Sequence, residues 1–238
     1  MATESKRKCE TCTHFNCFIN KYCSEEWKPI ITLNKTTTDY LPGTKIFSAG
    51  DVVKGVFEVF EGKIKIVSSY GDGKERIIGF SSREHILGYQ GLGRNRIYPV
   101  TAIALEKSQV TSIPIDIFYK AVKANPEMAL YLVTFLADQL KESETRMKLF
   151  SLMSALEKVA FGLLTIVNSF GFDEHDETML RYTPTRKDIS SLSGTTYETV
   201  IRVLAEFEKN DVIKLEGKSI RILNLSMIKG ICQKYKIY

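Results

Sequence analysis

The chain has 238 residues, and its 33 Lys and Arg against 28 Asp and Glu give a net charge of +5 at pH 7. No apolar run is long enough to span a bilayer, and residues 1–10 are polar and charged, without the apolar core of a secretory signal. We therefore expect a cytoplasmic protein with no membrane partner. The sequence contains no glycine-rich nucleotide loop and no nucleophile–base pair, so an enzyme has no support.

Four of the five cysteines lie near the N-terminus, in the order Cys9-x2-Cys12-x4-Cys17-x5-Cys23. In a reducing cytosol, clustered cysteines indicate metal or redox chemistry rather than disulfides. Thiolates are soft ligands that suit iron–sulfur clusters or zinc. Only the first pair has the C-x2-C spacing that zinc sites use at both ends, which favours an iron–sulfur cluster. The alternatives are a zinc site or a cysteine-bearing tail without metal, and His14, more simply a surface histidine, could replace one ligand.

Residues 40–118 are rich in β-branched and aromatic residues and are punctuated by glycines. This pattern predicts short strands that form a small all-β sandwich or barrel. Asp72-Gly73 predicts a hairpin turn between strands at 64–67 and 76–80. Pro114 is expected to close the strand region, because proline is poorly tolerated inside a sheet.

After Pro126 the apolar residues recur at helical spacing over about 25 residues, which predicts one long helix at 126–150. A helix of this length is expected to connect two domains and to form a homodimer interface. The alternative is that its apolar stripe packs only on the β-domain. The residues assigned to the dimer interface are Leu132, Phe135, Leu136, Leu140 and Met147.

A helix is predicted at 154–170, with Gly171 as its C-cap signal, and a short helix is predicted at 186–192. A second helix follows after the turn at Ser193-Gly194, so that residues 185–213 form a helix-turn-helix. We expect this second helix to begin near Thr195, because Thr195-x-x-Glu198 has the spacing of a capping box. Its apolar face comprises Val200, Val203, Leu204 and Phe207, and its opposite face comprises Tyr197, Glu198, Ile201, Arg202 and Lys209.

The charge distribution favours double-stranded DNA as the partner of this motif. Residues 181–238 contain eleven Lys and Arg against six Asp and Glu, so all the excess positive charge of the chain lies there. Two short runs in which apolar and polar residues alternate lie on either side of Gly217 and predict a β-hairpin at 213–223. This hairpin would make the motif a winged helix. The residues expected to contact phosphates are Thr185, Arg186, Thr195, Thr196, Lys214 and Lys218.

The order of these elements and several short motifs resemble the Crp/Fnr family of bacterial transcription regulators, over roughly residues 9–225. The motifs are TRKDI at 185–189, ETVIR at 198–202, FSAGD at 47–51 and FEGKIKI at 60–66. The resemblance implies an α+β fold with a cyclic-nucleotide-binding-like β-roll, a long dimerisation helix and a C-terminal winged helix-turn-helix. We place the cysteine-rich segment at 1–30, the β-roll at 31–125, the dimerisation helix at 126–150 and the DNA-binding domain at 151–238.

The resemblance also implies how DNA is read. A homodimer would place its two recognition helices about 34 Å apart on a pseudo-palindrome and recruit or block RNA polymerase. Glu198 and Arg202 match the base-reading pair of the family, in which arginine pairs with guanine O6 and N7 and glutamate accepts from cytosine N4. Tyr197 and Ile201 replace residues that differ between family branches and are assigned to the outer bases of the half-site.

The sensor is predicted by comparison with two branches of the family. Cyclic-nucleotide-responsive members use an Arg-Ser or Arg-Thr pair where this chain has Tyr98-Pro99, so no cyclic nucleotide is expected. Fnr-type members hold a [4Fe–4S] cluster with N-terminal cysteines, and their fourth ligand comes from the β-roll, where this chain has Thr111. We therefore assign all four ligands to Cys9, Cys12, Cys17 and Cys23. The alternatives are a regulator that answers a small ligand in the β-roll, and a signalling or interaction module that does not bind DNA.

Overall fold

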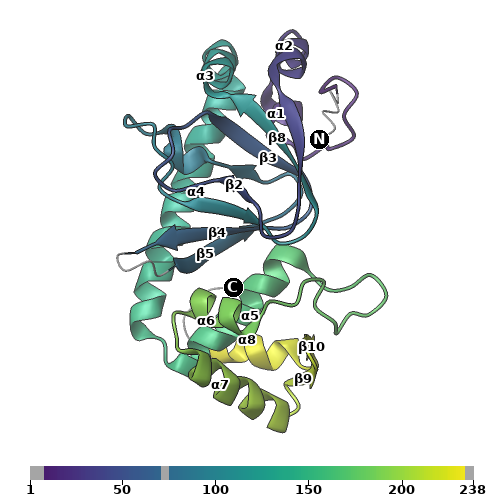
Figure 1. Ribbon diagram of the computed structural model, residues 1–238, viewed down its shortest axis with the longest axis vertical. Helices are drawn as coiled ribbons and strands as arrows, with labels where there is room; N and C mark the ends of the chain where they lie inside the picture. Colours follow the sequence, from purple (N-terminus) through teal and green to yellow (C-terminus); the bar gives the residue numbers. More distant parts are fainter. Residues whose placement is uncertain (1–7, 71–74, 234–238) are drawn as a thin grey trace. The chain divides into compact units, whose positions relative to one another are not determined.

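The computed structural model describes residues 8–70 and 75–233, and they form two compact units (Figure 1). The first comprises Met1–Gly73 with Phe80–Glu142, and the second comprises Lys74–Gly79 with Ser143–Tyr238. Helices and antiparallel sheets occur together, which confirms the predicted α+β class. None of the helices in the described ranges is long and apolar enough to cross a membrane.

The predicted strand region forms two four-stranded sheets, ordered β1-β8-β3-β6 and β2-β7-β4-β5. β8 ends at Pro114, as the sequence predicts, and β4 and β5 are neighbours. The predicted turn at Asp72-Gly73 lies outside the described residues. The strands are β1 Thr36–Tyr40, β2 Lys45–Phe47, β3 Gly55–Glu61, β4 Ile64–Ser69, β5 Glu75–Ser81, β6 Ile86–Leu87, β7 Thr101–Ala104 and β8 Ser108–Pro114.

Aromatic side chains fill the space between the two sheets. Phe47 of β2 stacks on Phe57 of β3, with ring centroids 5.3 Å apart, and on Tyr98, at 4.3 Å. Tyr98 is fully buried, and its hydroxyl donates to the Gly55 carbonyl oxygen at 2.7 Å. A Cβ atom at Gly91 would lie 3.1 Å from the Tyr98 ring, so glycine there leaves room for the ring. The interior of the β-roll is therefore occupied by its own side chains.

Two short helices precede the β-roll, α1 Phe18–Tyr22 and α2 Trp27–Asn34, and the sequence pattern did not predict either of them. They pack with α3 Ile115–Ala124 and the start of α4 Pro126–Leu152 in one apolar core. Tyr22 stacks on Tyr131 of α4 with ring centroids 4.3 Å apart. The Ser24 amide donates to Asn125 Oδ1 at 2.8 Å. The N-terminal segment is thus held against the rest of its unit.

Helix α4 confirms the predicted long helix. The residues assigned to the dimer interface differ in exposure: some are buried within the unit and others face solvent. Leu132 is buried in the core of its own unit, and Phe135 contacts Tyr89 there. Leu132 is therefore covered within its own unit, and Phe135 is half-buried there. A different stripe is exposed at alternating spacings of three and four residues, the spacing of a coiled-coil seam. Its members are Leu130, Val133, Ala137, Leu140 and, one heptad further, Met147, with Leu136 beside them.

The second unit contains the predicted helix-turn-helix and hairpin. α5 Ala155–Phe170 begins with a capping box between Ser154 and Glu157 and ends at Gly171. α5 contacts α6, α7 and α8, which surround it. The remaining elements are α6 Arg186–Ser193, α7 Tyr197–Lys209, β9 Ile213–Glu216, β10 Ser219–Ile222 and α8 Leu225–Gln233.

Candidate functional site

The turn between α6 and α7 has the predicted geometry, but α7 begins later than expected. Gly194 adopts φ 60°, a conformation that glycine reaches without strain. The N-cap of α7 is Thr196, whose hydroxyl accepts from the Thr199 amide at 3.2 Å. The predicted capping box from Thr195 to Glu198 is therefore wrong. The Thr195 hydroxyl instead lies 3.1 Å from the Ser193 hydroxyl and stabilises the turn itself.

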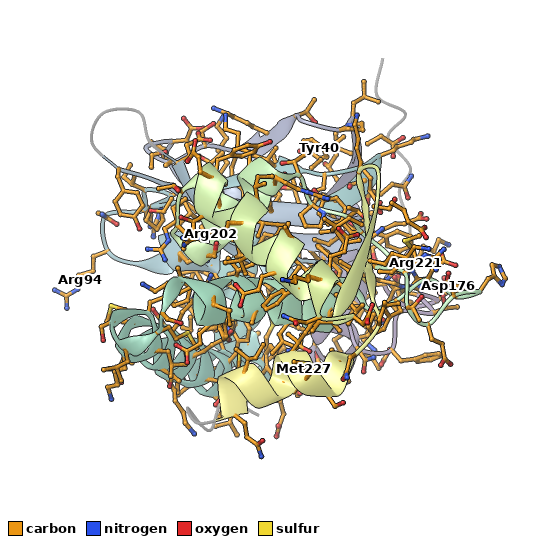
Figure 2. All side chains as sticks on the ribbon, turned by 90° about the horizontal axis from the view of Figure 1, so that it is seen from below. Tyr40, Arg94, Asp176, Arg202, Arg221 and Met227 are labelled. Atoms are coloured by element: carbon orange, nitrogen blue, oxygen red, sulfur yellow. The ribbon has the colours of Figure 1, made fainter. Side chains whose placement is uncertain are left out.

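The two faces of α7 are confirmed. Val200, Val203, Leu204 and Phe207 are buried in the second unit. The other face is open to solvent and carries one acid, one base and two large apolar side chains at its N-terminal end. Its exposed members are Tyr197, Glu198, Ile201, Arg202 and Lys209. Figure 2 shows Arg202 projecting from this helix. The four residues predicted to read bases, Tyr197, Glu198, Ile201 and Arg202, thus share one exposed helical surface.

The β-hairpin is fixed by a small charged network. Arg221 of β10 forms ion pairs with Glu216, at 2.8 Å, and with Asp176, which Figure 2 shows beside it. Hydrogen bonds from Thr178 and the ion pair with Arg221 hold the pKa of Asp176 well below its usual range. At the hairpin turn, Gly217 adopts φ 61°. This network sets the position of the hairpin within its own unit.

Two of the predicted phosphate-contacting residues lie on the hairpin. Lys214 and Lys218 are both exposed. Lys214 is paired with Glu216 at 3.1 Å, and Arg186 of α6 donates to the Lys218 carbonyl oxygen at 3.1 Å. The latter bond ties the hairpin to the helix-turn-helix.

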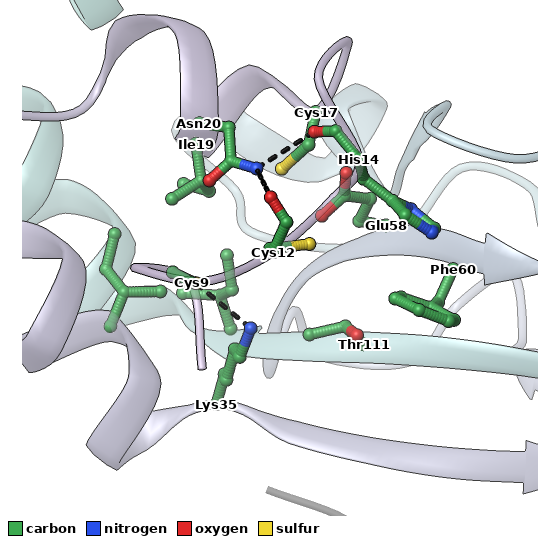
Figure 3. A pocket seen from close by; sticks show the side chains of 12 residues that line it. Cys9, Cys12, His14, Cys17, Ile19, Asn20, Lys35, Glu58, Phe60 and Thr111 are labelled. Atoms are coloured by element: carbon green, nitrogen blue, oxygen red, sulfur yellow. Dashed lines mark hydrogen bonds between the residues drawn. The ribbon is translucent and has the colours of Figure 1, made fainter. Parts of the chain in front are cut away.

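The second candidate site is a pocket between the cysteine segment and the β-roll (Figure 3). Three cysteines and the Glu58 carboxylate line this pocket, and Figure 3 shows the sulfur atoms of Cys12 and Cys17 beside Glu58. The residues that line the pocket are Cys9, Cys12, His14, Cys17, Ile19, Asn20, Ile31, Lys35, Glu58, Phe60, Thr111 and Ile113. The structure therefore brings three of the four predicted thiol ligands together. Thr111, the position at which the resemblance implies a β-roll cysteine, lines the same pocket.

Hydrogen bonds shape the loop that carries these cysteines. The Asn20 amide nitrogen donates to the carbonyl oxygens of Cys12 and His14, at 3.3 and 2.9 Å. The Cys9 amide donates to the Thr32 hydroxyl at 2.9 Å. Lys35 Nζ lies 3.0 Å from Cys9 Sγ, close enough to stabilise negative charge on that sulfur.

Cys17 and Cys23 lie at the two ends of α1, as its N-cap and C-cap residues. Burial raises the pKa of the Cys17 thiol well above its usual range and that of Cys23 to about 11. Bare thiolates are therefore disfavoured here, and a metal that binds them must displace their protons. Cys23 is buried like Cys17, but it does not line the pocket.

Glu58 and His14 are two further donors at this pocket, and the sequence pattern did not indicate their burial. Glu58 of β3 is only 9% exposed, and burial raises its pKa to about 7. His14, expected as a surface histidine, is 4% exposed, and its ring stacks on Phe60 with centroids 4.0 Å apart. A buried acid beside three thiols is a donor set suited to iron.

The arrangement of these donors differs from that of a single-ion site. Among the described residues, no three Cys, His, Asp or Glu side chains are grouped closely enough to hold one metal ion. A zinc site needs its ligands to converge on one ion at about 2.0–2.3 Å. An iron–sulfur cluster instead takes each thiolate on a different iron, so its ligands lie further apart. The described residues thus do not form a site for a single zinc ion at this pocket.

Comparisons with known proteins agree with both units. Residues 37–125 match the sequence model of the cyclic nucleotide-binding domain, and residues 157–231 match that of the Crp-like helix-turn-helix domain. The chain is 30% identical to the "Transcriptional activator protein FnrA" of Stutzerimonas stutzeri over 182 residues, which are 76% of this chain and 74% of that protein. The chain belongs to the Crp/Fnr family of transcription regulators.

Other members of the Crp/Fnr family match over most of the chain. The "Fumarate and nitrate reduction regulatory protein" of Vibrio cholerae is 27% identical over 235 residues, which are 93% of this chain and 92% of that protein. The solved structure of FixK2 from Bradyrhizobium japonicum has a TM-score of 0.72 at 22% identity, covers 83% of this chain and 96% of its own, and supports the fold. Family membership makes the chain a DNA-binding transcription regulator and not an enzyme, so a module without DNA binding is set aside.

Proposed function

We propose that this Crp/Fnr-type regulator senses oxygen or redox state through a [4Fe–4S] cluster held by its N-terminal cysteines. As a homodimer it binds a pseudo-palindromic promoter site and acts on RNA polymerase. The single observation that carries the proposal is the pocket, because Cys9, Cys12 and Cys17 line it together against the β-roll. Cys23 is the fourth thiol of the segment and lies at the other end of α1. When bound, the cluster would supply a group whose integrity depends on oxygen.

Contacts within the first unit support a route from the cysteines to the dimer helix. Cys17 caps α1, and Tyr22 at the end of α1 stacks on Tyr131 of α4. Tyr131 lies between Leu130 and Val133, which are exposed on the same helix. A ligand bound at Cys17 would fix α1, and α1 in turn would fix the part of α4 that carries the dimer stripe. Loss of that ligand would shift the population away from the dimer if the two states differ in dimer affinity.

The exposed stripe on α4 supports the homodimer. Leu130, Val133 and Leu140 are each more than 60% exposed, and they recur at coiled-coil spacing. A second copy of the same helix would cover them. The dimer would then carry two α7 helices, which would bind successive major grooves about 34 Å apart. Glu198 and Arg202 would then read the inner bases of each half-site, and Tyr197 and Ile201 the outer ones.

The interior of the β-roll argues against a small ligand as the signal. Tyr98, Phe47 and Phe57 occupy the space between the sheets, and the Tyr98 hydroxyl is satisfied by Gly55. No arginine stands at Tyr98 or Pro99 to meet a cyclic phosphate.

The test is DNA binding by protein purified without oxygen, before and after exposure to air. A half-site sequence is first selected from random duplexes, and affinity is then measured by fluorescence anisotropy at several salt concentrations. The proposal predicts salt-dependent, sequence-selective binding that weakens at least about tenfold after air, a loss of about 1.4 kcal/mol. Equal affinity before and after air would leave a DNA-binding regulator but would remove the redox sensor.

A further inference from the structure

We infer that the β-roll supplies the fourth ligand of the cluster through the Glu58 carboxylate, and that Cys23 is a structural residue. This inference rests on the proposed cluster and names its ligand set as Cys9, Cys12, Cys17 and Glu58.

The register of the sheet places Glu58 where a β-roll ligand is needed. β3 and β8 pair antiparallel, and Glu58 is the partner of Thr111 in that ladder. Side chains directly opposite each other share one face of the sheet, with Cβ atoms about 4.5–5.5 Å apart. Both residues line the pocket together with the three cysteines. A metal ligand at Glu58 could therefore take the place of one at Thr111 without any change in the fold.

Thr111 itself is already engaged. Its hydroxyl lies 2.9 Å from the hydroxyl of Thr37 on β1, and both side chains are buried. A hydroxyl is also a much weaker iron ligand than a thiolate or a carboxylate. The other oxygen donor in this part of the pocket wall is the Glu58 carboxylate on the neighbouring strand, which also interacts with the Cys17 thiol.

Glu58 has an unsatisfied oxygen. The residue is 9% exposed, and Oε1 is buried without a hydrogen-bond partner among the described residues. A buried polar atom without a partner costs about 1–3 kcal/mol, and more if it is charged. Lys35, the cation at the pocket, has its ammonium 3.0 Å from Cys9 Sγ. A positively charged iron in the pocket would satisfy this oxygen.

Cys23 differs from the other three cysteines in one respect. It is buried in the same apolar core as Cys9 and Cys17, but it does not line the pocket. Its amide donates to the Ile19 carbonyl oxygen at 3.0 Å and ends α1.

A carboxylate ligand would also give the cluster one distinct iron. Oxygen is a harder ligand than thiolate sulfur and holds iron in such clusters less firmly. The iron on Glu58 would therefore be the first to be lost. That iron is also the one attached to β3, so its loss would break the link between the cysteine segment and the β-roll.

The experiment compares four full-length variants, purified without oxygen, by iron and sulfide content and by electron paramagnetic resonance. Glu58→Gln removes the proposed ligand, Glu58→Cys offers a thiolate at the same place, and Cys23→Ser removes the thiol outside the pocket. Glu61→Gln, on an exposed residue of the same strand, is the control. Far-UV circular dichroism verifies that each variant is folded.

We expect about four irons per chain in Cys23→Ser, Glu58→Cys and Glu61→Gln, and three or fewer in Glu58→Gln. After one-electron reduction of the cluster by dithionite, Glu58→Cys should also change the resonance spectrum, because one ligand becomes sulfur. A full cluster in Glu58→Gln, or its loss in Cys23→Ser without loss in Glu58→Gln, would overturn the inference. If both of these variants lose iron, retention by Glu58→Cys supports the inference and loss there overturns it. An iron-free wild-type protein would instead refute the cluster itself.

Discussion

Glu58 lies directly opposite Thr111 in the ladder between β3 and β8. Thr111 occupies the position at which the resemblance implies a β-roll cysteine. A side chain that can bind metal therefore still lies next to this position. A carboxylate stands one strand away on the same face, and its buried Oε1 has no hydrogen-bond partner in the part of the chain that the structure describes. The proposed Glu58 ligand rests on this relationship.

Replacing Arg202 by alanine should relax DNA specificity. The side chain is exposed on α7, and a bidentate pair with guanine is worth about 1–3 kcal/mol of discrimination. We expect the variant to accept other bases at one position of each half-site, measured by anisotropy against a set of single-base variants. Lys214→Ala is the control, because it should weaken all sequences equally and lower the salt slope by about one. Uniform weakening by Arg202→Ala would mean that the guanidinium meets only phosphate.

A charge on the exposed stripe of α4 should separate the dimer. Val133→Asp places a carboxylate in the stripe, whereas Thr134→Asp places one on the exposed polar side of the same helical turn. Burying an unpaired carboxylate is costly, so the first variant should raise the dimer dissociation constant at least about tenfold. Analytical ultracentrifugation measures both. Equal dimerisation by the two variants would place the interface elsewhere.

Tyr98 should be a structural residue of the β-roll interior. Tyr98→Ala removes a fully buried ring and should lower the free energy of unfolding by about 3–5 kcal/mol. Tyr98→Phe loses only the two hydrogen bonds that the hydroxyl makes with the backbone of Gly55, and it should cost about 1–3 kcal/mol. Urea denaturation measures both changes. Cyclic AMP should leave the Tm of the wild-type protein unchanged, and a rise that grows with nucleotide concentration would reveal a ligand site in the β-roll.

The Asp176–Arg221 pair should stabilise the DNA-binding unit at neutral pH and lose its effect in acid. The pKa of Asp176 is depressed in the folded state, so its contribution is complete above the unfolded pKa, about 3.9, and is lost as pH falls through the folded pKa. Asp176→Asn should therefore be less stable than wild type at pH 7, with a difference that shrinks towards pH 3. Glu177→Gln, an exposed neighbour, should show no such trend in thermal unfolding. A difference that does not depend on pH would rule out the carboxylate charge as the cause.

Local patterns predicted the elements whose signals are contained in neighbouring residues. Gly171 and Gly194 mark helix ends, and the spacing from Val200 to Phe207 predicts the buried face of α7. The N-cap of α7 was predicted one residue too early, because Thr195 and Thr196 are both residues that commonly cap a helix. The contact between Thr195 and Ser193 decides between them, and it depends on the geometry of the turn.

The pocket could be predicted only in part. Cysteine spacing identified Cys9, Cys12 and Cys17, but no periodic pattern separates Cys23 from them. Glu58 belongs to a strand that is buried on both faces, so the usual alternation of apolar and polar residues is missing there. Its role depends on its partner in β8, which is 53 residues away in sequence. Similarly, Leu132 and Leu140 are both leucines at helical spacing in α4. Leu132 is buried because it packs against α1 and α3, whereas Leu140 is exposed, and the sequence pattern does not show this difference.

The central claim is that the cysteine pocket holds an iron–sulfur cluster. The most direct measurement is the iron and sulfide content of the wild-type protein purified without oxygen, with its visible spectrum recorded before and after air is admitted. We predict a brown protein with about four irons and four sulfides per chain that bleaches in air. A colourless protein, purified under the same conditions without iron or sulfide and still able to bind its palindrome, would contradict the account.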